Sequence, residues 1–183
     1  MTKVVNFYGG PSAGKSTMAA QLFGWMKNKR MNVEYVPEFA KQLTWRQAGC
    51  LDDQFYVFGN QHHELYTLKD QVDYIITDSP LLMSMHYADV GLSKFDDEDF
   101  LLREVFDELV LATYMQYDNI NFFVERGDRK FVQAGRNQDE ATSKEFDEDI
   151  YQILTENWVL FKTVRSLNDV LAELKMEVCI DEE

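Results

Sequence analysis

A run of small and polar residues near the N-terminus has the composition and spacing of a phosphate-binding loop. Residues 9–16 match the pattern G-x-x-x-x-G-K-[ST]. Glycines let the backbone curl so that successive N–H groups point at phosphate oxygens, and the start of a helix adds partial positive charge. We expect Lys15 to reach the β- and γ-phosphates of a nucleotide, and the Ser16 hydroxyl to ligate Mg²⁺. The residues predicted to contact the nucleotide here are Gly10, Pro11, Ser12, Ala13, Gly14, Lys15, Ser16 and Thr17.

Two acidic residues follow predicted strands and are candidates for the chemistry of phosphoryl transfer. Asp78 comes directly after an apolar run, where an acidic residue secures Mg²⁺ in enzymes with this loop, so we assign it with Ser16 to a metal site. Its structural alternative is a helix N-cap before Pro80. Glu38 follows Val36 and Pro37, and is interpreted as a general base or an anchor for an acceptor hydroxyl. An acidic residue in the first turn of a helix would also stabilise that helix, so both interpretations stay open.

A basic cluster stands out in an acidic chain. Arg126, Arg129, Lys130 and Arg136 fall within a polar stretch after the fourth predicted strand. Phosphoryl transfer needs cations around the migrating group, and guanidinium groups supply fixed donors there. We predict a lid over about residues 125–138, with Arg126 and Arg136 as catalytic residues and Arg126 also contacting the nucleotide. The alternative is an ordinary solvated loop.

The acceptor side of the site has weaker candidates. The Gln61 amide could pair with the edge of a nucleobase, and Tyr56 could stack on one, as could Phe55 or Trp45. Arg46 is a further candidate for acceptor binding. Taken singly, the aromatic residues are more often core or surface residues. His62 and His63 are adjacent, so they lie on different faces of a helix, which argues against a joint metal site.

Apolar strands and amphipathic helices alternate along the chain. We expect strands at 4–8, 32–36, 72–77, 121–124 and 158–163, and helices at 18–30, 37–48, 52–71, from 80 onward, 96–117, 139–157 and after Ser166. This order predicts a three-layer α/β/α fold with a parallel sheet of about five strands. Ligands bind beyond the carboxyl ends of such strands, where the motifs above fall. An apolar stripe in the 96–117 helix (Leu101, Val105, Leu109 and Ala112), widened by Leu102, Phe106 and Val110, predicts that this helix is substantially buried.

Length, charge and cysteine content limit the class of protein. The 183 residues are expected to form a single domain over 1–183, with a loose acidic tail at 181–183. The net charge of −14 opposes a broad nucleic-acid or membrane surface, although a local basic cleft is compatible with it. Two isolated cysteines indicate a reduced cytoplasmic protein. We expect no signal peptide and no membrane span.

From Lys3 to about Leu154, the order of these motifs resembles the small P-loop kinases of the nucleoside and nucleotide kinase type. The sequence looks closest to phage-encoded kinase-like ATP-binding proteins of the AAA type and to the nicotinamide-riboside-kinase-like group. The resemblance to deoxynucleoside kinases implies that Glu38 is the base, that Gln61 pairs with the nucleobase, and that Arg126 and Arg136 are lid arginines. In those kinases an arginine follows the acidic residue of the third strand, whereas here Ser79 follows Asp78, which leaves the acceptor class open.

The prediction is an ATP- and Mg²⁺-dependent phosphotransferase with the P-loop NTPase fold. It would move the γ-phosphate of ATP to a hydroxyl or phosphate of a nucleoside- or nucleotide-like acceptor. One alternative is a kinase that acts on a hydroxymethylated pyrimidine in bacteriophage DNA, where a flipped base needs few contacts. Another is a nucleotide-dependent regulatory ATPase without a small-molecule acceptor. The sequence leaves open a homodimer and the choice between ATP and GTP, and a phage-encoded protein would work in the host cytoplasm.

Overall fold

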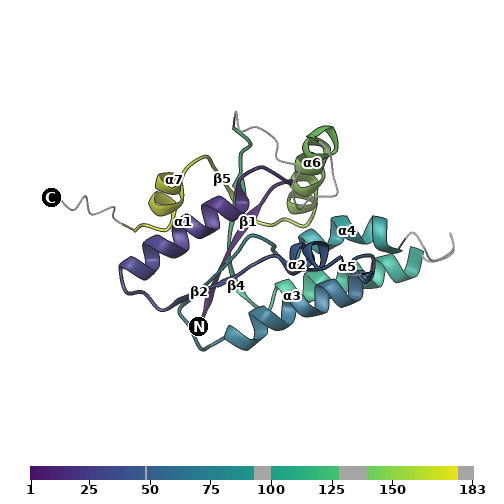
Figure 1. The fold of residues 1–183 in the computed structure, drawn as a ribbon, viewed down its shortest axis with the longest axis horizontal. Helices are drawn as coiled ribbons and strands as arrows, with labels where there is room; N and C mark the ends of the chain where they lie inside the picture. The colour runs from purple at the N-terminus through teal and green to yellow at the C-terminus, as the bar shows by residue number, and fades with distance from the viewer. Residues whose placement is uncertain (48, 93–99, 128–139, 177–183) are drawn as a thin grey trace.

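The computed structural model describes residues 1–47, 49–92, 100–127 and 140–176, which form an α/β domain (Figure 1). The strands are β1 (Lys3–Tyr8), β2 (Val33–Val36), β3 (Tyr74–Thr77), β4 (Asp118–Val124) and β5 (Lys162–Val164). The helices are α1 (Lys15–Asn28), α2 (Phe39–Trp45), α3 (Gln54–Leu68), α4 (Met83–Leu92), α5 (Phe100–Tyr114), α6 (Glu140–Glu156) and α7 (Leu167–Glu173).

The five strands form one parallel sheet in the order β2-β3-β1-β4-β5. β1 lies at the centre, where Val4 pairs with Ile75 of β3 and with Asn119 of β4. The predicted fold class is therefore confirmed. Because all strands run the same way, the segments that follow β1, β2, β3 and β4 meet at one edge of the sheet. That edge carries the phosphate loop, Glu38, Asp78 and Arg126.

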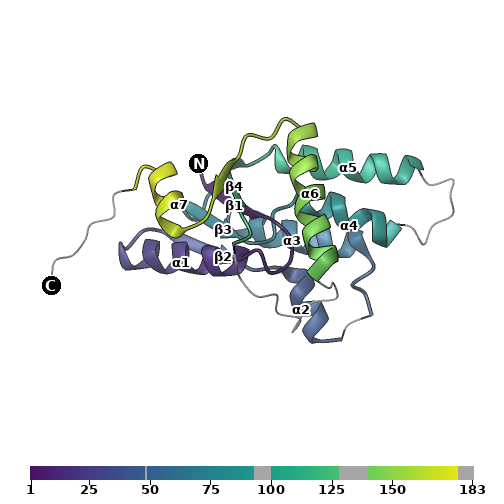
Figure 2. The same ribbon diagram turned by 90° about the horizontal axis from the view of Figure 1, so that it is seen from above.

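Helices cover both faces of the sheet (Figures 1 and 2). α1 and α7 lie side by side on one face, whereas α3, α4, α5 and α6 lie on the other. Successive side chains of a strand point to opposite faces, so Val5 and Phe7 of β1 pack under α1 and α7. Val4 and Tyr8 pack into the other half of the core. A full capping box at Ser166 and Asp169 starts α7, which confirms the predicted cap at Ser166.

The predicted fifth strand was placed too early. Trp158 and Leu160 are each 90% exposed, and β5 begins only at Lys162. Trp158 has a positive φ of 55°, so the chain turns there after α6 instead of extending. Two other boundaries also differ. β4 begins at Asp118, three residues before the predicted start, and α4 begins at Met83 instead of Pro80.

The buried side of α5 differs from the prediction. Phe106, Val110 and Tyr114 face the core, whereas Leu101, Val105 and Leu109 are 69%, 52% and 47% exposed, and Ala112 is also exposed. Apolar residues surround most of this helix, so the periodicity supports two apolar faces and does not choose between them. Neighbouring residues of α3 determine that Phe106 faces the core, because its ring packs edge-on against Phe55 and Phe58.

Several predictions fall outside the described residues. They concern the start of the 96–117 helix, the lid residues from 128 onward, including Arg129, Lys130 and Arg136, and the tail at 181–183. Within the described ranges, no helix combines the length and the apolar character that crossing a membrane requires.

Candidate active site

The phosphate loop connects β1 to α1 in a conformation that leaves backbone donors exposed at the helix start. Gly9, Ser12 and Gly14 have φ values of 132°, 63° and 108°, all in the left-handed region. Gly14 occupies the N-cap of α1 and supplies no side-chain cap. The first-turn N–H groups of an α-helix have no acceptor within the helix, so those of α1 are available to an anion together with the positive end of the helix dipole.

The Lys15 side chain folds back over this loop. Its Nζ donates hydrogen bonds to the carbonyl oxygens of Gly9 at 2.6 Å and Gly10 at 3.0 Å. The ammonium group therefore lies against the loop that begins with Gly9. A cation held there adds to the loop's backbone donors, which is the arrangement that a bound polyphosphate needs.

Asp78 is a buried carboxylate at the end of β3. It is 2% exposed, and its Oδ1 has no hydrogen-bond partner among the described residues. The alternative role as a helix N-cap does not apply, because α4 begins at Met83. Burying a charged oxygen without a partner is costly, which indicates a missing ligand at this atom. A carboxylate from Asp78 and the Ser16 hydroxyl fit the hard-oxygen preference of Mg²⁺, which keeps several water and phosphate ligands.

Tyr35 of β2 supports Asp78 and was not identified from the sequence. Its phenol lies near the Asp78 carboxylate, because the charge of that carboxylate acts on the pKa of Tyr35. Burial raises the pKa of Tyr35 well above its usual range, and the charges of Asp78 and Glu38 raise it further. The phenol therefore stays protonated beside the carboxylate. The signal available in the sequence was a tyrosine on the strand next to the one that ends in Asp78.

Glu38 lies at the start of α2, but its side chain does not cap the helix. The Phe39 N–H instead donates a hydrogen bond to Oε1 of Gln61, at 2.9 Å. A carboxylate that does not cap its own helix leaves the purely structural interpretation of Glu38 with less support. Glu38 also lies near Tyr87 of α4. Burial raises the pKa of Tyr87, and the negative charge of Glu38 raises it further. Tyr87 is thus a second residue near Glu38 that the sequence did not reveal.

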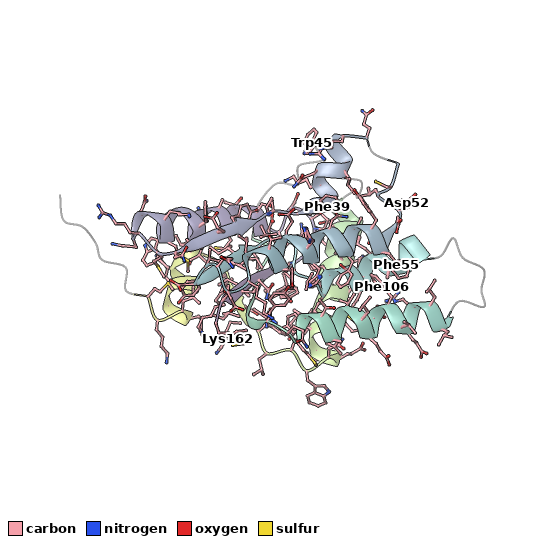
Figure 3. All side chains as sticks on the ribbon, turned by 90° about the horizontal axis from the view of Figure 1, so that it is seen from below. Phe39, Trp45, Asp52, Phe55, Phe106 and Lys162 are labelled. Carbon is pink, nitrogen blue, oxygen red and sulfur yellow. The ribbon has the colours of Figure 1, made fainter. Side chains whose placement is uncertain are left out.

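The predicted acceptor residues lie in different places. Gln61 is buried, with Oε1 bonded to Phe39 and with Nε2 lacking a partner in the described part of the chain. Tyr56 packs its ring against Phe39, with ring centroids 5.7 Å apart. Arg46 ends α2, at about 12 Å along the helix axis from Glu38, so α2 separates these two residues. Figure 3 shows Phe39 between α2 and α3, and Trp45 projecting outward beyond α2.

Arg126 follows β4 and is held against the phosphate loop by α6. Its Nε donates to Oδ2 of Asp147 at 2.7 Å, and its Nη2 donates to the carbonyl and hydroxyl oxygens of Ser143 at 2.9 and 2.8 Å. Asp147 in turn accepts a hydrogen bond from the Gly10 N–H, and the Ser143 hydroxyl donates to the Pro11 carbonyl oxygen. The sequence did not reveal the roles of Ser143 and Asp147; their spacing of four residues on one helix was the available signal.

The fold and the loop define a P-loop nucleotide-binding domain with a kinase-like arrangement of strands and helices. Within that class, the chain belongs to the AAA domain family AAA_28, whose model matches residues 4–168. This confirms the P-loop family resemblance seen in the sequence. A search of curated proteins finds no match.

Solved structures of similar fold include three kinase-related or nucleotide-related proteins. Thymidylate kinase from Ehrlichia chaffeensis is 16% identical with a TM-score of 0.62, and the alignment covers 96% of this chain and 100% of that one. Deoxyadenosine kinase from M. mycoides with bound dATP is 16% identical with a TM-score of 0.61, covering 94% and 99%. NadR in complex with NR is 16% identical with a TM-score of 0.68, covering 100% of this chain and 54% of NadR. At this identity the similarity establishes the fold.

Proposed function

We propose that the protein is an ATP- and Mg²⁺-dependent phosphotransferase that moves the γ-phosphate of ATP to a nucleoside- or nucleotide-like acceptor. The observation that carries the proposal is the convergence of four groups at one edge of the sheet: the phosphate loop after β1, Glu38 after β2, Asp78 after β3 and Arg126 after β4. The similarity in fold to thymidylate kinase and deoxyadenosine kinase supports the same reaction class.

The roles divide between the two sides of this edge. The loop, Lys15 and Arg126 would bind and neutralise the phosphates of ATP. Ser16 and Asp78 would hold Mg²⁺, which would supply positive charge to stabilise the negative charge of the phosphates. The protonated Tyr35 phenol beside Asp78 would help to orient its carboxylate.

Glu38 would act on the acceptor, either by taking the proton of an attacking hydroxyl or by anchoring the acceptor. Its neighbour Tyr87 offers a phenol on the same side. Gln61 fixes the start of α2 and so fixes the position of Glu38, and its Nε2 is a donor that a nucleobase edge could accept. The predicted lid over about residues 125–138, with Arg136, would close over the phosphates.

Transfer assays with labelled ATP test this proposal directly. Purified protein and Mg²⁺ are incubated in parallel with nucleosides, nucleotides, DNA containing hydroxymethylated pyrimidine, or buffer alone. Label on a nucleoside or nucleotide is the expected result. Label on DNA alone would identify the DNA-modifying alternative, and release of phosphate into water without any labelled acceptor would identify a regulatory ATPase. Failure of ATP to bind at all would contradict the proposal.

A further inference from the structure

The first turns of α6 pack directly on the phosphate loop. We call the set of Gly10, Arg126, Ser143 and Asp147 the α6–loop contact. Its hydrogen bonds join three segments that are far apart in the sequence: the loop, the residues after β4, and α6. Ser143 is fully buried, and the Arg126 and Asp147 side chains are only 15% and 18% exposed. Because this charge pair is largely buried and makes several hydrogen bonds, its two side chains are held in one geometry.

Gly10 is required by this contact and not by the phosphate-loop pattern. The pattern G-x-x-x-x-G-K-[ST] requires glycine at Gly9 and Gly14 and accepts any residue at position 10. In the structure, a Cβ atom built on Gly10 would lie 2.5 Å from the Ser143 carbonyl oxygen and 2.9 Å from Oδ1 of Asp147. The missing side chain therefore lets α6 approach the loop backbone.

Arg126 uses some, but not all, of its N–H groups in this contact. A guanidinium carries five N–H groups. Asp147 takes the one on Nε and Ser143 takes those on Nη2, whereas Nη1 has no hydrogen-bond partner in the described ranges. Asp147 thus fixes the arginine from one side, beside the loop, through a bond that does not involve Nη1.

From these observations we propose that Asp147 is a positioning residue. It holds the Arg126 side chain and the Gly10 backbone in fixed positions through its two hydrogen bonds. The position of α6 therefore sets the affinity of the site for the phosphates of a nucleotide. The inference rests on the nucleotide binding proposed above, and it concerns a residue outside the loop and outside the set of predicted site residues. The opposing possibility is that the Asp147 carboxylate competes with phosphate for the same donors, which predicts the opposite change in affinity.

The test is a double-mutant cycle read by direct binding of ATP in the presence of Mg²⁺, for example by isothermal titration calorimetry. The variants are Asp147→Asn, Arg126→Ala and the double variant. Glu148→Gln is the matched control, because it removes one negative charge from the next residue of the same helix at an exposed position. Thermal melting of each variant monitors the fold. Ser143→Ala serves if Asp147→Asn does not fold. It keeps the carboxylate and removes the hydroxyl that accepts from Arg126 and donates to Pro11.

We expect Asp147→Asn to weaken ATP binding by about tenfold, as for the loss of a charge-assisted hydrogen bond. Arg126→Ala should weaken it at least as much. The loss caused by Asp147→Asn should be smaller in the Arg126→Ala background than in the unsubstituted protein, because Asp147 acts partly through Arg126 and partly through the Gly10 N–H. Ser143→Ala should give a smaller loss that is reduced in the Arg126→Ala background, with the remainder due to the lost hydrogen bond to Pro11. Glu148→Gln should bind normally.

Three outcomes would overturn the role of Asp147: unchanged affinity in Asp147→Asn, tighter binding in that variant, or a loss of affinity that persists in full without Arg126. If Ser143→Ala has to replace Asp147→Asn, the same three outcomes in Ser143→Ala would overturn the role of Asp147. If the unsubstituted protein does not bind ATP, the proposed function fails first, and the role assigned to Asp147 fails with it. Binding by the unsubstituted protein together with any of the three outcomes removes only the role of Asp147.

Discussion

Asp78 illustrates how a candidate functional residue can oppose stability. Its carboxylate is buried, with Oδ1 lacking a hydrogen-bond partner among the described residues, and the Tyr35 phenol beside it offsets part of the cost of desolvation. Functional sites commonly keep such groups at the expense of stability. The surrounding fold must therefore supply the free energy that holds Asp78 in place when no cation is bound.

Asp78→Asn should separate these two effects. The amide keeps an acceptor for Tyr35 and removes the buried charge, so without Mg²⁺ we expect a melting temperature about 2–4 °C higher, equivalent to about 1 kcal/mol. Phosphoryl transfer should fall by at least about 10²-fold, since a neutral amide is a poor ligand for Mg²⁺. Melting curves with and without Mg²⁺ and transfer assays measure both. A variant that melts lower and still transfers at the normal rate would contradict the assignment.

Lys15→Ala tests the phosphate loop itself. The ammonium group donates to the Gly9 and Gly10 carbonyl oxygens. We expect the loss of such hydrogen bonds at a half-buried position to shift the melting temperature by no more than a few degrees. Turnover should fall by more than about 10²-fold, because the cation beside the phosphates is lost. Steady-state transfer and thermal melting check this. Near-normal turnover in a well-folded variant would remove the kinase interpretation.

Glu38→Gln tests the acceptor side. ATP binding should change little, because the phosphate loop and Arg126 do not depend on Glu38. Single-turnover transfer at saturating ATP should fall by roughly 10²–10⁴-fold if the carboxylate is a general base. Since the Glu38 side chain does not cap α2, Glu38→Gln removes no helix cap, and the melting temperature should change by no more than a few degrees. Transfer at the wild-type rate would end the catalytic role of Glu38.

Among the secondary-structure elements, α5 shows why a helix can be predicted while its buried face is not. Residues 100–114 are apolar on most sides, so the helix itself follows from sequence periodicity. Which side packs inward depends on Phe55 and Phe58 of α3, whose rings pack against Phe106. Figure 3 shows Phe55 and Phe106 close together. Such a contact joins residues about fifty positions apart and has no signature in a local pattern.

The neighbouring pair Phe106 and Val105 gives a matched test of this orientation. Phe106→Ala should cost about 3–5 kcal/mol, because it leaves a cavity in the core. Val105→Gln, one position earlier and 52% exposed, should change stability by less than about 0.5 kcal/mol. Urea or guanidinium unfolding of both variants measures the difference. Equal costs at both positions would show that α5 presents another face to the core.

The candidate site likewise contains residues that sequence motifs predict and residues that only tertiary packing brings together. The positions of Lys15, Ser16, Glu38 and Asp78 follow from motifs that end predicted strands, because a parallel sheet brings strand ends together. Tyr35, Tyr87, Ser143 and Asp147 reach the site through tertiary packing, and none of them belongs to a local motif. The phosphate loop is thus predictable from the sequence, whereas the residues that hold its neighbours in place require the structure.

For the whole molecule, the excess of negative charge sets a further expectation. A net charge of −14 on a domain of 183 residues produces self-repulsion that opposes the compact state. Raising NaCl from about 10 mM to about 150 mM shortens the Debye length from about 30 Å to about 8 Å. We therefore expect the melting temperature to rise by a few degrees over this range. Scanning calorimetry with Mg²⁺ and nucleotide excluded measures it, and a falling melting temperature would show that attractive ion pairs dominate.

The strand order also has a consequence for how the chain folds during synthesis. β1 is made first, but its two neighbours in the sheet are β3 and β4, which end at Thr77 and Val124. Pairings between such distant segments carry a high loop-closure cost and slow the folding of a domain. While the ribosome adds the residues between Tyr8 and Val124, the central strand has at least one open edge. The apolar strand that precedes the phosphate loop is thus the segment most exposed to misassociation before the sheet is complete, and a natural place for a chaperone to act.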